Sequence, residues 1–504
     1  MLFNSFEYLI FLPIVFILYW FVFDYALSKC KHQLWLQNLF IVVASYIFYG
    51  WWDWRFLILI AITSFCSWAS GLLIGRRKGE EAKEENTPYT LHLTQKPKFW
   101  LISNIILNLS ILSVYKYYDF FAREFAALLG IESDFLLLHL ILPVGISFYT
   151  FQALSYSIDV YRGHIQPTKD IVSFTAFLSF FPQLVAGPIE RATNLLPQFQ
   201  RKRTFDYEQA VDGMRQILWG LFKKIVIADN CAAYVDQVWA TYDTQSGSTL
   251  LLAAILFTFQ IYGDFSGYSD IAIGSAKLFG ITLMRNFNVP YFSRDIAEFW
   301  RRWHISLTTW FRDYVYIPLG GSRPVVPAML EVKGERSKAR YTKWIAVRNT
   351  FIIFLLSGFW HGANWTFIVW GIYHALLFVP LLLMGKNRRY VHPKINASEW
   401  PRMLLTLVLV MMGWVLFRAP SLADAWGYIC GICSMSIWSI PSLITDYLLW
   451  FTLLMIVLMI VAEWRSREQD TAPLPHNRWV YYAIVLLIYW FATDKTTEFI
   501  YFQF

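Results

Sequence analysis

Residues 2–25 read LFNSFEYLIFLPIVFILYWFVFDY, with no charged residue between Glu7 and Asp24. A transmembrane helix needs about 20 predominantly apolar residues, so this run predicts a membrane span. No basic stretch precedes the run and no small-residue cleavage site follows it. We therefore expect it to be retained as a span and not removed as a signal peptide.

Similar runs recur along the whole chain and indicate the fold class. Of the 504 residues, 57% are hydrophobic and 15% charged, whereas soluble domains have about 45–50% and about 25%. The composition excludes a disordered or ordinary soluble protein and predicts an all-α polytopic membrane protein, with about eleven transmembrane or re-entrant helices in one integral-membrane domain over 1–504. The further apolar segments are 35–49, 54–74, 99–115, 135–152, 171–189, 250–279, 344–360, 366–383, 403–417, 444–462 and 479–491, and 205–242 is expected to form a long, partly amphipathic helix.

The basic residues lie in loops between these segments, which explains the net charge of +8 without a nucleic-acid partner. Lys29 and Lys31 follow the first span, and a charged loop occupies about 76–98. Two crossings separate the two loops, so both lie on the same side of the membrane. Short cytoplasmic loops are enriched in Lys and Arg. We therefore predict that both loops are cytoplasmic and that the N-terminus is extracytoplasmic.

Two of the apolar segments contain helix breakers. Segment 171–189 is interrupted by Pro182, Gly187 and Pro188 and has basic residues on both flanks. We predict a re-entrant element there, which a membrane protein tolerates where protein or water surrounds the backbone. Segment 250–279 contains three glycines, so we predict a broken span.

Residues 295–316 read DIAEFWRRWHISLTTWFRDYVY, and their aromatic residues recur at helical spacing. Trp on the apolar side and Arg on the other faces are typical of an interfacial helix. His304 lies near the middle of this predicted helix. Two roles fit that position: a functional imidazole, or an imidazole that reaches lipid headgroups or water.

His361 lies deep in an apolar stretch, LLSGFWHGANWTF at 355–367, between Gly358 and Gly362. A neutral imidazole is the side chain best able to take a proton near neutral pH. The pattern favours a general base in a membrane-embedded cavity, with a structural histidine between helices as the alternative. Asn364 stands one turn away, and for His374 we expect a core role.

Two carboxylates, Asp264 and Asp270, lie in the apolar sequence QIYGDFSGYSD at 260–270. They predict either a polar lining of a passage or partners for buried Arg. Cys430 and Cys433 lie one turn apart without a second pair, so we expect no metal site. No motif for phosphate or serine-hydrolase chemistry is convincing.

The two histidine-centred stretches resemble the signature of the membrane-bound O-acyltransferases. The branch that fits best is that of the alginate O-acetyltransferase membrane subunit and its peptidoglycan O-acetylating relatives. The stretches that carry the resemblance are WRRWHISLTTWFRDY (300–314), IPLGG (317–321), WHGANWTF (360–367), PQLVAGPI (182–189), DFSGYSD (264–270), WVLFRA (414–419) and IYFQF (500–504).

The resemblance implies a bundle with a central funnel or tunnel and a catalytic core at about 140–385. His361 would be the catalytic base that deprotonates the acceptor, and His304 would orient a substrate or stabilise developing charge. The expected cavity or substrate contacts are Asn364, Trp365, Trp303, Ser306, Arg312, Asp313 and Asp264.

The activity implied is O-acyl transfer from a cytoplasmic acyl thioester, most simply acetyl-CoA, which acts as a substrate; no bound cofactor and no metal are expected. The acyl group would move toward hydroxyls of a cell-surface polysaccharide such as alginate, cellulose or peptidoglycan. A separate extracytoplasmic acetyltransferase would complete the transfer, and the chain would lie in a bacterial cytoplasmic membrane. The alternatives are D-alanyl transfer to teichoic acid, a transporter or flippase of polysaccharide intermediates, and a scaffold that has lost activity.

Overall fold

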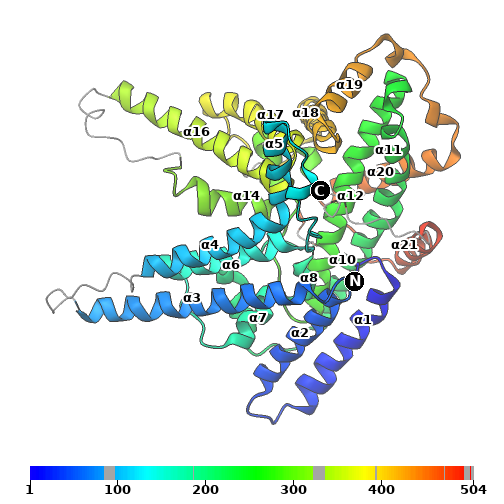
Figure 1. The fold of residues 1–504 in the computed structure, drawn as a ribbon. Helices are drawn as coiled ribbons and strands as arrows, with labels where there is room; N and C mark the ends of the chain where they lie inside the picture. Colours follow the sequence, from blue (N-terminus) through cyan, green and yellow to red (C-terminus); the bar gives the residue numbers. More distant parts are fainter. Residues whose placement is uncertain are drawn as a thin grey trace. The chain divides into compact units, whose positions relative to one another are not determined.

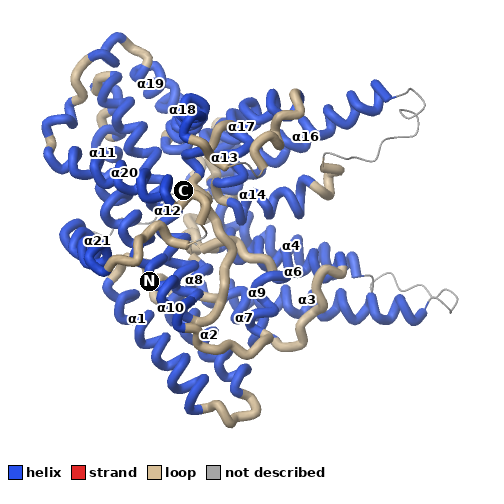
Figure 2. Tube along the Cα trace, turned by 180° about the vertical axis from the view of Figure 1, so that it is seen from behind, coloured by secondary structure: helices blue, strands red, loops and turns tan. Residues whose placement is uncertain are grey.

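The computed structural model describes residues 1–84, 97–185, 187–321, 335–391, 394–469, 471–492 and 500, without the side chains of 76–84. Within these ranges the chain forms helices and loops and no strand (Figure 2), which confirms the all-α class. Residues 85–96 of the charged loop and 501–504 of the terminal motif lie outside the described part. The chain divides into two compact units, Met1–Ile217 with Ile271–Met284, and Leu218–Asp270 with Arg285–Phe504.

Seven helices in the described ranges are long and apolar enough to cross a membrane, or eight if Leu422–Ile432 and Met435–Thr445, bent by 52°, form one span. This number is lower than the eleven elements expected, because several apolar segments form short or broken helices. The seven are Phe6–Ala26, Phe56–Gly75, Pro97–Lys116, Gly247–Leu278, Trp365–Leu383, Ala397–Arg418 and Tyr447–Arg465.

In the first unit, the helices α3 (Phe56–Glu84), α4 (Pro97–Lys116) and α6 (Ile146–Arg162) lie side by side (Figure 1). Polar side chains join them: the Asn104 amide donates to Ser157 Oγ at 2.7 Å and accepts from Ser67 Oγ at 3.2 Å. Such hydrogen bonds satisfy polar groups that the lipid cannot. The helices of this unit are α1 (Phe6–Ile17), η1 (Leu18–Ala26), α2 (Gln33–Gly50), α3 (Phe56–Glu84), α4 (Pro97–Lys116), α5 (Tyr118–Leu129), η2 (Asp134–Leu136), α6 (Ile146–Arg162), α7 (Ile171–Ser179), α8 (Phe181–Leu184), α9 (Ala192–Phe199) and α10 (Tyr207–Leu221), which continues into the second unit.

The second unit contains a helical hairpin formed by α16 (Glu335–His361) and α17 (Trp365–Leu383) (Figure 1). A Cβ on Gly358 would lie 2.2 Å from the Phe367 carbonyl oxygen, and one on Gly371 would lie 2.3 Å from that of Phe354. The two glycines therefore allow the antiparallel backbones to touch. The helices are η3 (Phe222–Ala228), α11 (Asp229–Trp239), η4 (Tyr242–Thr244), α12 (Gly247–Leu278), η5 (Pro290–Phe292), α13 (Ile296–Arg302), α14 (Ile305–Phe311), η6 (Arg312–Tyr316), α16 (Glu335–His361), α17 (Trp365–Leu383), η7 (Ala397–Glu399), α18 (Trp400–Arg418), α19 (Leu422–Ile432), η8 (Met435–Trp438), η9 (Ser442–Thr445), α20 (Tyr447–Arg465) and α21 (Arg478–Phe491).

The prediction of a broken span at 250–279 is wrong, because α12 is continuous over 32 residues. A Cβ on Gly263 would lie 3.0 Å from the Lys223 carbonyl oxygen, and one on Gly267 would lie 2.8 Å from that of Gly220. These glycines therefore serve close backbone packing, as small residues do between membrane helices. They do not interrupt the helix.

The prediction of one interfacial helix at 295–316 is also wrong. Helix α13 ends at Arg302, the backbone turns through a left-handed residue at His304 (φ 44°), and α14 begins at Ile305. Trp303 and Trp310 are buried, so the aromatic stripe packs in the protein core. The helical spacing of the aromatic residues continues across the break, which is why the pattern alone did not reveal it.

Two further segments bear on the predictions. The span expected at 135–152 is α-helical only from Ile146, after the short 3-10 helix η2 and a left-handed Gly145 at the N-cap of α6. Segment 171–189 is broken, as expected: α7 ends at Ser179, and the short α8 has a proline in its first turn. Its re-entrant placement in the membrane stays a prediction.

Replacement of Gly267 by Ala tests the close packing of α12. We expect a lower apparent midpoint of thermal unfolding in detergent, because overpacking costs about 1–3 kcal/mol and the obstacle is backbone. Gly50→Ala is the control, since its Cβ would meet only the movable tip of Leu57, at 3.0 Å. Equal midpoints for the two variants would contradict the role given to Gly267.

Candidate active site

His361 is the last residue of α16, at the turn of the α16–α17 hairpin. Its ring is buried and meets Trp360, Trp370 and Phe417 edge-on, with centroids 5.0, 5.1 and 5.2 Å apart. Asn364 follows at the N-cap of α17, where its side chain accepts from the Thr366 N–H at 3.0 Å. The hairpin turn thus holds the imidazole inside an aromatic cluster.

His304 occupies the break between α13 and α14 and is 1% exposed. Its ring meets Phe265 edge-on at 4.6 Å and lies 5.8 Å from the ring of Trp360. Because Trp360 also contacts His361, the structure brings both predicted histidines to one aromatic cluster. Burial lowers the pKa of His304 to about 3, since a desolvated imidazole disfavours its charged form. The ring is therefore neutral at physiological pH.

Asn286, which was not among the residues predicted from the sequence, holds the His304 turn. Its Oδ1 lies 3.1 Å from His304 Nδ1 and accepts from Ser306 Oγ at 2.9 Å, and its backbone carbonyl accepts from the Ile305 N–H at 2.9 Å. Asn286 Nδ2 donates to Ser269 Oγ at 3.1 Å. A lone Asn in a loop carries no pattern that distinguishes it, so no sequence signal pointed to this residue.

The other predicted contacts take several roles. Ser306 joins Asn286 in the His304 turn, and Trp303 is buried against Trp414, at 4.8 Å between ring centroids. Arg312 and Asp313 pair with each other at 2.7 Å and remain partly exposed. Trp365 is 49% exposed at the start of α17. Roles of these side chains in substrate binding stay predictions.

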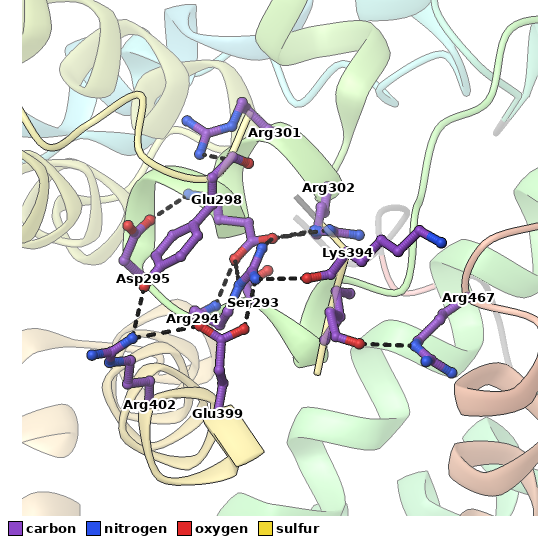
Figure 3. A network of polar contacts seen from close by, with 12 residues as sticks. Ser293, Arg294, Asp295, Glu298, Arg301, Arg302, Lys394, Glu399, Arg402 and Arg467 are labelled. Carbon is purple, nitrogen blue, oxygen red and sulfur yellow. Dashed lines mark hydrogen bonds and ion pairs between the residues drawn. The ribbon is translucent and has the colours of Figure 1, made fainter. Parts of the chain in front are cut away.

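A network of charged side chains fixes α13 in place (Figure 3). Glu298 Oε1 accepts from Arg294 and from Arg302, both at 2.9 Å, and Arg294 also pairs with Glu399 at 2.7 Å. Burial alone would raise the pKa of Glu298, but the bonds from Arg294 and the charge of Arg302 hold it below its usual range. Arg301 donates to the Asn387 carbonyl at 2.8 Å. These contacts place the end of α13, and with it the His304 turn.

Asp264 and Asp270 are partners of buried cations, with Lys in place of the expected Arg. Asp264 pairs with Lys224 at 2.7 Å and accepts from the Ile500 N–H at 2.7 Å. Asp270 pairs with Lys223 at 2.6 Å. The contacts of Asp264 are those of a charge partner, and a role in substrate binding stays a prediction. Among the described residues, no group of three or more His, Cys, Asp or Glu could hold a metal ion.

Lys224→Met tests this buried pairing. We expect a loss of about 3–5 kcal/mol of stability, because Asp264 would be left as an uncompensated buried charge, and the partly exposed Asp229, which pairs with the same lysine at 2.7 Å, would lose that partner. The readout is the apparent midpoint of thermal unfolding in detergent. Arg312→Ala is the control, since an exposed pair contributes about 1 kcal/mol or less. If both variants unfolded at the same temperature, the buried pair would not be a structural requirement.

Comparisons with known proteins show the family of this chain. Residues 164–332 match the membrane-bound O-acyltransferase family, MBOAT. The chain is 38% identical to the probable alginate O-acetylase of Azotobacter vinelandii over 457 residues, which are 89% of this chain and 83% of that protein. It is 34% identical to the peptidoglycan O-acetyltransferase of Helicobacter pylori over 455 residues, 84% of this chain and 78% of that protein. The teichoic acid D-alanyltransferase of Bacillus subtilis is more distant, at 29% over 291 residues, 55% of this chain and 69% of that protein.

The first two of these relatives cover most of the chain, and the family match contains the His304 stretch. They confirm the resemblance seen in the sequence, and the apolar helices agree with it. The chain is therefore a multi-pass membrane protein that belongs to the membrane-bound O-acyltransferase family and acts as an O-acyltransferase.

Proposed function

We propose that the protein takes acetyl groups from a cytoplasmic acyl thioester, most simply acetyl-CoA, toward hydroxyls of a cell-surface polysaccharide. The observation that carries the proposal is the pair of buried histidines, His304 and His361, on one aromatic cluster beside Trp360. A thioester is already activated, so the enzyme mainly has to align the reactants, accept a proton and exclude water. Buried imidazoles among aromatic rings suit that task.

In this mechanism His361 acts as the general base. It takes the proton of the acceptor hydroxyl while the oxygen attacks the thioester carbonyl. The new C–O bond forms, the C–S bond breaks, and the departing thiolate takes the proton from the imidazolium. The products are an acetyl ester and a free thiol. General-base catalysis by a positioned imidazole contributes about 10²–10⁴-fold.

The relatives support the proposed acceptor, and the basic loops support the proposed location. Two of them are named for O-acetylation of alginate and peptidoglycan, which supports a polysaccharide as the final acceptor. We propose that the acetyl group reaches it through an extracytoplasmic acetyltransferase. The basic loops support a place in the bacterial cytoplasmic membrane with the N-terminus outside. D-alanyl transfer is the second candidate. It is supported by the similarity to a teichoic acid D-alanyltransferase, which is 29% identical over 55% of this chain.

The first test is the O-acetyl content of purified surface polysaccharides. We expect acetyl ester to be lost in a deletion strain, restored by the wild-type chain and not restored by His361→Ala at matched membrane abundance, because the general base is absent. D-alanyl ester is measured in the same samples.

His374→Leu is the matched control for that experiment. His374 is a second buried imidazole that meets Trp370, with ring centroids 4.9 Å apart, and we expect it to serve the core only. Its variant should retain most of the acetylation. Full acetylation with His361→Ala would remove His361 from the mechanism, and loss of D-alanyl ester alone would favour the second candidate.

The donor is tested with inverted membrane vesicles. We expect vesicles that contain the wild-type chain to release free thiol from acetyl-CoA when the acceptor is present, and His361→Ala vesicles to release only the background amount. The measurement is thiol formation against time, with His374→Leu as the control. Acetyl-CoA that stays intact while polysaccharide intermediates cross the membrane would support a transporter and contradict acyl transfer.

A further inference from the structure

The side chain of Asn286 is fully buried and faces His304 from the loop before η5. Its Oδ1 is the shared acceptor of three groups: the Ser306 N–H at 3.3 Å, the Ser306 hydroxyl at 2.9 Å, and His304 Nδ1 at 3.1 Å. Its Nδ2 donates to Ser269 Oγ at 3.1 Å. Asn286 therefore holds the His304 turn through its Oδ1 and is itself bound to α12 through its Nδ2.

The identity of the amide atoms follows from the backbone. A backbone N–H only donates, so the atom of Asn286 that faces the Ser306 N–H must be the oxygen. Ser306 Oγ lies 3.5 Å from His304 Nδ1, but its single proton goes to the closer Asn286 Oδ1 at 2.9 Å. The ring nitrogen that faces the same oxygen at 3.1 Å then carries a proton, because two acceptors do not form a hydrogen bond. The neutral His304 ring is consequently protonated on Nδ1, and its Nε2 bears a lone pair.

We propose that Asn286 is a positioning residue that fixes His304 as the Nδ1–H tautomer, so that Nε2 accepts a hydrogen bond from the hydroxyl of the acyl acceptor. The proposal rests on the proposed function and assigns His304 to the acceptor side of the reaction. A lone pair on Nε2 receives an O–H and does not donate to a thioester carbonyl or an oxyanion. Of the two reacting groups in the proposed transfer, the acceptor hydroxyl and the thioester carbonyl, only the hydroxyl can donate to this lone pair.

The backbone supports the same assignment. His304 is one of three described non-glycine residues with positive φ, a conformation that costs about 1–2 kcal/mol for an L-residue. The Ile305 N–H, next along the chain, donates to the Asn286 carbonyl at 2.9 Å. Asn286 thus binds the turn through its main chain as well as its side chain. Strained residues held in this way cluster at functional sites.

The surroundings keep the ring neutral. Phe265 from α12, Trp360 from α16 and Phe287 from the loop before η5 lie against it, and none of these side chains is charged. Asn286 is a neutral acceptor, so it selects the tautomer without favouring the imidazolium. A carboxylate at the same place would accept the same bond and also stabilise the charged ring.

The tautomer is measured directly by nitrogen NMR of the full-length protein in lipid, with ¹⁵N-labelled histidine. The His304 signal is identified by its loss in His304→Gln. We expect a protonated Nδ1 and an unprotonated Nε2 in the wild type at pH 7. A proton on Nε2 would overturn the proposal. This readout does not depend on acyl transfer, so it still decides the tautomer if the proposed function fails.

Asn286→Asp tests the consequence for activity at wild-type membrane abundance. We expect the ratio of variant to wild-type turnover to stay constant above the shifted pKa of His304 and to fall below it, because only the neutral ring accepts the hydroxyl and a carboxylate raises the pKa of a neighbouring imidazole by about one to three units. The ratio removes the titration of His361, which both proteins share. Ser269→Ala is the control, since it removes the bond to Nδ2 and leaves the bond to His304 in place, and its ratio should not depend on pH. A purely structural Asn286 would lower the ratio equally at every pH, and that result would contradict the proposal.

Discussion

The ion pair between Arg294 and Glu298 is the interaction on which the placement of the active site depends. Both side chains are 1% exposed, and Arg302, at the last turn of α13, shares the same carboxylate. Two guanidinium groups thus hold the helix between the loop before it and the turn after it. Breaking such a pair would leave an uncompensated buried charge. The end of α13, and with it His304, is therefore held rigidly.

A second constraint comes from the lipid, which cannot satisfy backbone or side-chain polar groups. Hydrogen bonds and ion pairs inside each unit satisfy these polar groups. Asn104 links three helices of the first unit, and the buried Lys223 and Lys224 pair with carboxylates of α12 in the second. Glycines on α12 and in the α16–α17 hairpin let backbones approach closely. The polar groups named here therefore hold the helices together.

The two histidines of the aromatic cluster differ in what holds them. His361 ends a helix and is enclosed by three aromatic rings, whereas His304 sits in a left-handed turn that Asn286 holds through its side chain and its main chain. A base has to exchange its proton within the reaction, while a group that orients a hydroxyl needs a fixed lone pair. Aromatic enclosure suits the first task, and a firm hydrogen bond to Nδ1 suits the second.

The helical membrane fold and most of the long apolar helices followed from the sequence, because apolar length is a local property of the chain. Two long motifs, which are also local, made both histidines candidates. The break at His304 and the continuity of α12 did not follow from the sequence. The aromatic spacing continues across the break and therefore hides it. A glycine in an apolar segment predicts a helix break, and only the tertiary structure shows that the glycines of α12 pack against another backbone. The sequence did not indicate a role for Asn286 either, because an isolated Asn belongs to no recognisable pattern. Its contacts join α12, the loop before η5 and the start of α14, segments that only tertiary structure brings together.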